Sequence, residues 1–299
     1  MKRIFVLAIL CGCCSAFAAE SYSDLLRQAD NLAKAQKIDD AERIYLQAAD
    51  AARNSDETAT ALYRRADLLK QQKRYDEAID AFGEILAVKK LPKHNRGTAL
   101  LGLARTMMLK GKTRDAIRYY KSAGSVNDGT WIDHVANAEL AGLCEKLGWY
   151  EDALAAHKAS SQGAKCTDES KASSYAGMVF SLAKLGRFNE AHETLDQLKA
   201  FAKDLRQPSV AASCGMAEAR LADAEKDWSH ALEMYRNVME LPKIHYLQRR
   251  AACNRAADIA LREIKDAGLA RTITEEYLKI DKYGVNEELL RELKKGDKK

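Results

Sequence analysis

The sequence of 299 residues carries 48 Lys and Arg against 43 Asp and Glu, so its formal net charge is only +5 at pH 7. Proteins that bind nucleic acid usually concentrate a stronger basic charge on one face, so this balance argues against a nucleic-acid partner. The chain has three prolines and 16 glycines, and so few helix breakers favour long helices.

Residues 1–18 have the order of a secretory signal peptide. A basic start is followed by an apolar core at 4–10, and Ala16 and Ala18 occupy the small positions of a cleavage site. The core is too short to cross about 30 Å of hydrocarbon as a membrane anchor. We therefore predict cleavage after Ala18 and export to the bacterial periplasm or cell envelope.

An alternative reading of the same region concerns Cys13. Leu10-Cys11-Gly12-Cys13 resembles the bacterial lipoprotein box, although Cys11 stands where Ala or Ser is usual. Lipidation of Cys13 would tether the protein to a membrane surface.

A short phrase of aromatic, acidic and alanine residues recurs along the rest of the chain. It reads "RYDEAIDAF" from Arg74, "WYEDALAAH" from Trp149 and "RFNEAHETL" from Arg187. An even spacing of this kind indicates a repeat architecture. The aligned alanines, at intervals of 37 to 40 residues, are Ala41, Ala78, Ala116, Ala153, Ala191, Ala231 and Ala270.

The residues around each alanine have helical spacing. Large side chains follow four positions later, as in Tyr45 and Phe82, and small ones stand twelve positions earlier, as in Ala29 and Ala66. Offsets of this kind line one face of a helix, so each unit is expected to be a pair of amphipathic helices. One hairpin cannot cover its own apolar stripe, and stacked neighbours supply the core. We therefore predict an all-α solenoid.

The pattern resembles the tetratricopeptide repeat family, most clearly in "KLGWYEDALAAH" and "KLGRFNEAHETL", where Gly148 and Gly186 are followed by an aromatic, then Ala. The resemblance covers about 22–280 and implies a right-handed superhelix of helical hairpins. The period here exceeds the usual 34 residues of the family. Within a solenoid at 19–281, the expected repeats are about 22–55, 59–92, 97–128, 134–166, 172–206, 212–242 and 244–281.

The last repeat departs from the others. Its small residue, Ala256 or Ala257, aligns only if one residue is added before the phrase that begins at Ala267. Terminal repeats are often atypical because they cap the stack. Residues 282–299 are expected to form a capping helix and a charged tail.

Four cysteines remain after the signal peptide: Cys144, Cys166, Cys214 and Cys253. An exported protein can meet an oxidising compartment. Cys214 and Cys253 stand at nearly equivalent places in neighbouring repeats and are the expected disulfide pair. The alternative is that Cys144 and Cys214, which lie within apolar helical stretches, are small buried side chains.

The sequence contains no motif that points to catalysis, a cofactor or a metal. H-E-x-x-H, a phosphate-binding glycine loop and G-x-S-x-G are absent, and no two histidines stand three or four residues apart. His157 takes the place of the aromatic residue of its repeat, so we expect it to pack in the core with a satisfied ring nitrogen. We expect no enzyme activity and no cofactor.

The family resemblance implies that the first helix of each hairpin lines a concave face that binds other proteins or extended peptides. The family's well-known clamp for a peptide carboxyl end is absent, since Leu26 and Asp30, then Tyr63 and Asp67, replace its Lys and Asn. Aromatic, Met and Arg side chains are typical interface anchors. The candidate partner-binding residues are Tyr63, Asp67, Lys70, Arg105, Met108, Phe180, Met216 and Arg220.

These features predict a non-enzymatic protein-interaction scaffold or adaptor in the cell envelope. One alternative is an outer-membrane assembly lipoprotein anchored through Cys13. Another is a cell-wall glycan binder that uses Trp131 and Trp149 as platforms. An enzyme with a site spread across repeats is the least favoured reading.

Overall fold

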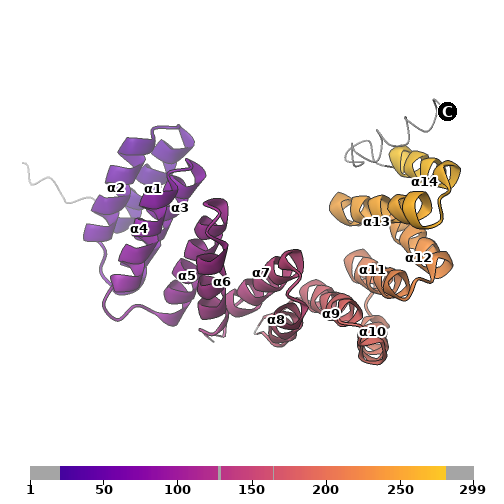
Figure 1. Cartoon of the computed structure of the whole chain (residues 1–299). Helices are drawn as coiled ribbons and strands as arrows, with labels where there is room; N and C mark the ends of the chain where they lie inside the picture. The colour runs from indigo at the N-terminus through magenta and orange to yellow at the C-terminus, as the bar shows by residue number, and fades with distance from the viewer. Residues whose placement is uncertain (1–20, 127–128, 164, 281–299) are drawn as a thin grey trace, which may run out of the picture. The chain divides into compact units, whose positions relative to one another are not determined.

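The computed structural model of the chain describes residues 21–126, 129–163 and 165–280. The predicted signal peptide at 1–18, Cys13 and the predicted cap and tail at 282–299 lie outside these residues. The described part of the chain contains 14 α-helices, one π-helical segment and no strand (Figure 1). The all-α prediction is confirmed. None of the described helices combines the length and the apolar character that a membrane crossing needs.

The chain divides into two compact units, the first ending at Leu91 and the second beginning at Pro92. We call them unit 1 and unit 2. The sequence pattern predicted one array and did not mark this division. Between the two units, Val88 is extended after α4, and Pro92, with φ −58° and ψ 147°, precedes α5. Unit 1 comprises α1 (Tyr22–Lys34), α2 (Ile38–Asp50), α3 (Ser55–Gln71) and α4 (Tyr75–Ala87).

Unit 2 continues the same hairpin pattern five more times, and each helix packs against the next along the chain. The first helices α5 and α7, α7 and α9, and most extensively α9 and α11 also touch. Its helices are α5 (Lys93–Leu109), α6 (Thr113–Gly124), α7 (Ile132–Leu147), α8 (Tyr150–Gln162), α9 (Asp168–Lys184), α10 (Phe188–Ala202), α11 (Pro208–Glu225), α12 (Trp228–Glu240), α13 (Tyr246–Asp258), the π-helical segment η1 (Ile259–Glu263) and α14 (Ala267–Ile280).

Side chains at the helix starts explain where several first helices begin. Ser21, Asn54 and Thr167 each accept a hydrogen bond from the backbone N–H three residues later, which satisfies one of the free donors of the first turn. Pro208 is the first residue of α11, where the missing N–H of proline has no cost. Polar caps and prolines therefore separate the hairpins.

The repeated alanine is the closest-packed position of every hairpin. All seven aligned alanines, from Ala41 to Ala270, have no exposed surface. Four residues later the large side chains are also buried, among them Phe82 and Tyr235 with 0 and 1% exposure. The small residue lets two helices approach, and the large one fills the space beside them at the density of a protein interior. The packing predicted from the spacing is confirmed.

Every hairpin turn uses one left-handed residue, always five positions before the repeated alanine. Gly111, Gly148 and Gly186 adopt φ values of 77°, 73° and 73°. This is the geometry in which a helix ends with glycine just beyond it. The other four hairpins have a side chain in the same conformation, with φ between 59° and 65°: Gln36, Lys73, Lys226 and Lys265.

The π-helical segment η1 accounts for the irregular last repeat. In six hairpins the residue after the left-handed one donates its N–H to the carbonyl five positions back, as Arg187 does to Leu182. In the seventh, Asp266 donates to Ala260, six positions back. A π-helical turn holds one extra residue. Ala257, with no exposed surface, is therefore the small residue that needed the added position.

Candidate binding groove

Hollows lie over the first helices of the hairpins in both units. The hollow of unit 1 has a volume of about 290 Å³. It brings together the predicted residues Tyr63 and Asp67 on α3. Its lining is Asp30 and Ala33 from α1, Tyr45 from α2, and Tyr63, Arg64, Asp67, Leu68 and Gln71 from α3.

The predicted residues of unit 1 are held by their own neighbours. The ring of Tyr63 lies edge-on to Phe82, with the ring centroids 5.7 Å apart. Asp67 forms an ion pair with Lys70 and accepts a hydrogen bond of 2.7 Å from Gln71 Nε2. Asp67 and Lys70 therefore neutralise each other.

The carboxylate of Asp30 completes the polar side of this hollow. It accepts a hydrogen bond of 2.7 Å from the Tyr45 hydroxyl and forms an ion pair with Arg64. Burial, and then the contact with Asp30, raise the pKa of Tyr45 well above its usual range. These contacts lie within unit 1 and leave its hollow with little unpaired charge.

Arg105 in unit 2 joins two successive repeats. Its Nε atom on α5 lies 3.1 and 3.0 Å from the two carboxylate oxygens of Glu139 on α7. Burial, and then Glu139, raise the pKa of Tyr120, which lies against the same pair. The guanidinium of Arg105 is thus already paired with a carboxylate of the protein itself. Met108, one turn further along α5, is partly buried.

The hollow of unit 2 collects side chains from four successive first helices. It has a volume of about 270 Å³, and we call it the unit 2 cavity. The predicted residues Met216 and Arg220 lie together here, and Met216 is only 8% exposed. The lining is Glu145, His157, Ser173, Ala176, Gly177, Ser213, Met216, Arg220, Leu247, Gln248 and Ala251.

Phe180 lies on α9 and contacts one cavity residue, Arg220. Its ring has Tyr150 edge-on at 6.1 Å between centroids. The guanidinium carbon of Arg220 lies 5.1 Å, and Lys184 Nζ 5.5 Å, from the ring centroid. Attraction of a cation to an aromatic ring orders both side chains. The structure therefore brings Phe180, Met216 and Arg220 into one region.

A histidine–glutamate pair forms one wall of the cavity. His157 Nε2 lies 2.7 Å from Glu145 Oε1, and His157 is 8% exposed. A Cβ atom on Gly177 would lie 2.2 Å from that same Nε2. The expectation that His157 packs in the core with a satisfied nitrogen holds for Nε2, whereas its buried Nδ1 has no hydrogen-bond partner among the residues that the structure describes.

Several lining residues were not identified from the sequence, notably Gly177, Ser173, Ser213 and Leu247. A glycine inside a helix costs about 1 kcal/mol relative to alanine, so Gly177 in the middle of α9 was an available signal. The serines and Leu247 have no distinguishing pattern, because their positions depend on how the first helices converge.

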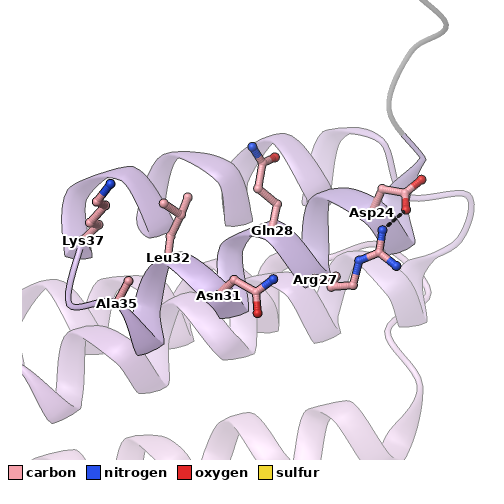
Figure 2. Close-up of a pocket in the computed structure, with 7 residues that line it drawn as sticks. All are labelled: Asp24, Arg27, Gln28, Asn31, Leu32, Ala35 and Lys37. Carbon is pink, nitrogen blue, oxygen red and sulfur yellow. Dashed lines mark hydrogen bonds and ion pairs between the residues drawn. The ribbon is translucent and has the colours of Figure 1, made fainter.

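The outer face of α1 carries a further hollow of about 400 Å³, lined by a row of mostly polar side chains (Figure 2). Arg27 pairs with Asp24 at 2.8 Å along the helix surface, and Gln28, Asn31 and Lys37 extend along the same side. A polar outer face is what a terminal hairpin needs to keep the stack soluble. We interpret this face as a cap.

The predicted disulfide between Cys214 and Cys253 is not formed in the structure, where all four described cysteines are free thiols. The two side chains belong to different packing layers. Cys253 lies in the core cluster formed with α12 and α14, whereas Cys214 packs against the cluster of α9 and α10. Side chains at equivalent positions of neighbouring repeats point in the same direction along the stack. Cys214 and Cys253 therefore do not face each other.

The two exposed tryptophans, which the glycan-binding alternative would use as platforms, lie apart from each other. Trp131 is 42% and Trp149 47% exposed. Trp131 precedes α7 and Trp149 follows it, so the 16 residues of the helix separate them by about 24 Å at 1.5 Å per residue. Nor does the described part of the chain gather three or more His, Cys, Asp or Glu side chains around a possible metal position.

Comparison with known proteins identifies the repeat. A family model described as tetratricopeptide repeat matches residues 18–90 and 57–123. No curated protein matches the sequence significantly.

Solved structures share the fold at low sequence identity. A tetratricopeptide repeat protein from Parabacteroides merdae superposes with a TM-score of 0.57 at 14% identity, covering 91% of this chain and 96% of that one. The apo form of RapI gives 0.58 at 12% identity, covering 91% and 80%. The C-terminal part of a repeat-containing protein from Cytophaga hutchinsonii gives 0.52 at 15%, covering 89% and 98%. These similarities extend the repeat fold over most of the chain.

Proposed function

We propose that the chain, of which residues 18–123 match the tetratricopeptide repeat family, is a non-enzymatic scaffold that binds other proteins or extended peptide segments on its first helices. The repeat fold is suited to a protein-interaction scaffold, because stacked hairpins present an extended surface. The single observation that carries the proposal is the unit 2 cavity, to which α7, α9, α11 and α13 each contribute side chains.

The composition of this region supports binding. Aromatic, Met and Arg side chains carry most of the energy at protein interfaces, especially where they surround a small pocket. Phe180, Met216 and Arg220 are residues of these types, and Leu247 at the rim is 43% exposed. An extended segment that crosses the first helices would cover Leu247 and the exposed parts of Phe180 and Arg220.

Affinity capture with a groove-blocking variant tests the proposal. Gly142 on α7 shares the helix face of the cavity residue Glu145, and a Cβ on Gly142 would meet no atom within 4 Å. A chain with Gly142→Trp should therefore fold, and its new indole ring should block the surface beside the unit 2 cavity. We expect it to recover at least tenfold less partner from native cells than the unaltered chain.

The matched control is Gly83→Trp, because a Cβ at Gly83 on α4 also meets no atom within 4 Å. Gly83 lies on a second helix, so this variant should recover the same partner as the unaltered chain. Equal recovery with both variants, or no specifically retained protein with any of the three chains, would overturn the proposal.

We further propose that the scaffold acts in the bacterial cell envelope, on the basis of the signal-like order of residues 1–18. The intact mass of the protein purified from native cells tests this. A chain that begins at Ala19 supports export and cleavage after Ala18. A chain that begins at Cys13 and carries acyl groups supports the lipoprotein alternative, and an uncleaved chain contradicts both.

A further inference from the structure

Two cations share one aromatic ring beside the unit 2 cavity. Arg220 and Lys184 lie 5.1 and 5.5 Å from the centre of the Phe180 ring. Among the described residues, neither has a carboxylate within ion-pair distance. Two positive charges on one ring repel each other, and an anion bound beside both would relieve that repulsion.

Two arginines on other first helices of unit 2, Arg105 and Arg255, differ in this respect. Arg105 is paired with Glu139, and Arg255 on α13 with Asp223 at 2.7 Å. These ion pairs join successive repeats and neutralise the charges of the two arginines. The unpaired charges of Arg220 and Lys184 therefore give this end of the cavity a local positive excess that a ligand can use.

The cavity itself suits one side chain of a larger partner. Pockets that enclose a whole small molecule usually measure about 300–1,000 Å³, and this one measures about 270 Å³. Ala176, Met216, Leu247 and Ala251 give it an apolar lining. A medium-sized aliphatic side chain would bury its surface here, and the chain that carries it would continue over the first helices.

The opposite wall has the opposite charge. Glu145 on α7 pairs with His157 at 2.7 Å, whereas Arg220 comes from α11 on the other side of α9. A ligand carboxylate near Glu145 would be repelled, and one near Arg220 attracted. A bound segment with a carboxylate near one end would therefore be held with that end at Arg220 and not at Glu145.

On these grounds, and resting on the proposed binding function, we propose that the unit 2 cavity receives an acidic peptide segment. The segment places an aliphatic side chain among Ala176, Met216 and Leu247 and a carboxylate beside Arg220 and Lys184. The carboxylate belongs either to an Asp or Glu side chain or to a C-terminus, since both offer the same chemistry.

The test uses the full chain and a positional-scanning library of synthetic N-acetylated decapeptides, made in both C-amidated and free-acid forms. We expect selection of Asp or Glu next to Leu, Ile, Val or Met. The best peptide is then made with Asn or Gln in place of its acids and, separately, with a free carboxyl end. We expect the neutral form to bind about tenfold more weakly, and binding of the acidic form to weaken with added salt. Tighter binding of the free-acid form would assign the carboxylate to a C-terminus.

Variants test the two cations directly. The double substitution Arg220→Gln and Lys184→Gln should weaken binding of the acidic peptide about tenfold. The matched control is Arg118→Gln with Lys171→Gln. These cations also lie over rings, those of Tyr119 and Phe201 at 5.0 and 4.9 Å, but both rings belong to second helices. The control should bind within twofold of the unaltered chain.

Three results would overturn this inference: no acidic peptide selected, equal binding of the neutral form, or equal losses in the two double variants. The proposed function has a separate outcome. If neutral or basic peptides are selected and Gly142→Trp abolishes their binding, the groove binds peptides but does not recognise a carboxylate. If capture from native cells fails, the scaffold function itself is contradicted.

Discussion

The imidazole of His157 reaches the carboxylate of Glu145, 2.7 Å away, across the one position of α9 that lacks a side chain. The missing Cβ of Gly177 makes this contact possible, because a methyl group there would lie 2.2 Å from two atoms of the ring. The contact links α8 to α7 past the backbone of α9, and it forms one wall of the unit 2 cavity.

Substitution of Gly177 therefore has a predictable sign. Gly177→Ala should destabilise the protein by about 1–3 kcal/mol through overpacking, despite the better helix propensity of alanine. Gly142→Ala, in open space on α7, should instead stabilise it by up to about 1 kcal/mol. Urea unfolding of both variants measures the difference. A stabilising Gly177→Ala would show that the histidine does not lie where the structure places it.

Opposite substitutions at two of the left-handed turn positions should change stability in opposite directions. Lys226 holds φ at 65° and Gly148 at 73° at equivalent places in their hairpins. A side chain in this conformation costs roughly 1 kcal/mol that glycine does not pay. Lys226→Gly should raise the free energy of unfolding by a fraction of that amount, and Gly148→Ala should lower it by about 1 kcal/mol. Thermal unfolding of both variants measures these changes. A shift of both unfolding temperatures in the same direction would contradict the shared turn geometry.

Cysteine reactivity follows from burial. Desolvation raises the pKa of the Cys253 thiol from its ordinary value of 9.0 to about 12. At pH 8 the reactive thiolate is then about a thousandfold scarcer than at an exposed cysteine. Timed alkylation followed by peptide mass spectrometry should label partly exposed Cys166 first and Cys253 only after denaturation. Rapid labelling of Cys253 in the folded chain would contradict its place in the core.

The same shift predicts a dependence of stability on pH. The thiol of Cys253 loses its proton near pH 9 in the unfolded chain but only near 12 in the folded one. Its contribution to stability is therefore complete below pH 9 and is lost as the pH rises towards 12. Cys253→Ala should reduce this alkaline loss in urea titrations at pH 8 and 10. An unchanged slope would assign the loss to other groups.

The extra residue of the last hairpin can be removed. Deletion of exposed Glu263 from η1 should convert the π-helical turn to α-helix and change the free energy of unfolding by less than about 1 kcal/mol. Deletion of Ala224 from regular α11 should cost more than about 3 kcal/mol, because it rotates the turn at Lys226 away from its alanine. Equal losses from the two deletions would mean that η1 is not a simple insertion.

Much of the fold followed from spacing alone. Ala78, Ala116 and Ala153 recur because each lies where two helices meet, and that contact depends only on local register. The break at Pro92 and the pair Cys214–Cys253 could not be assigned in this way. The relative position of the two cysteines depends on how successive hairpins turn relative to one another within unit 2, and one repeat's sequence does not specify that rotation.

The groove was predicted only in part for a related reason. Register placed Phe180 and Arg220 on the first helices, and the structure brings them into contact. Register could not show that Arg105 is paired with Glu139 or that Lys184 joins the ring of Phe180, because these contacts depend on side-chain direction and on the neighbouring repeat.

The proposal that partners bind on the first helices is tested most directly by site-specific photo-crosslinking in native cells. A photoreactive phenylalanine analogue is placed at Gly142 on α7 or at Gly83 on α4, and the adducts are identified by mass spectrometry. We predict a discrete protein adduct from position 142 that is absent from position 83 and disappears when Arg220 and Lys184 are replaced with Gln. Adducts from position 83 alone, or the same adducts from both positions, would contradict the account.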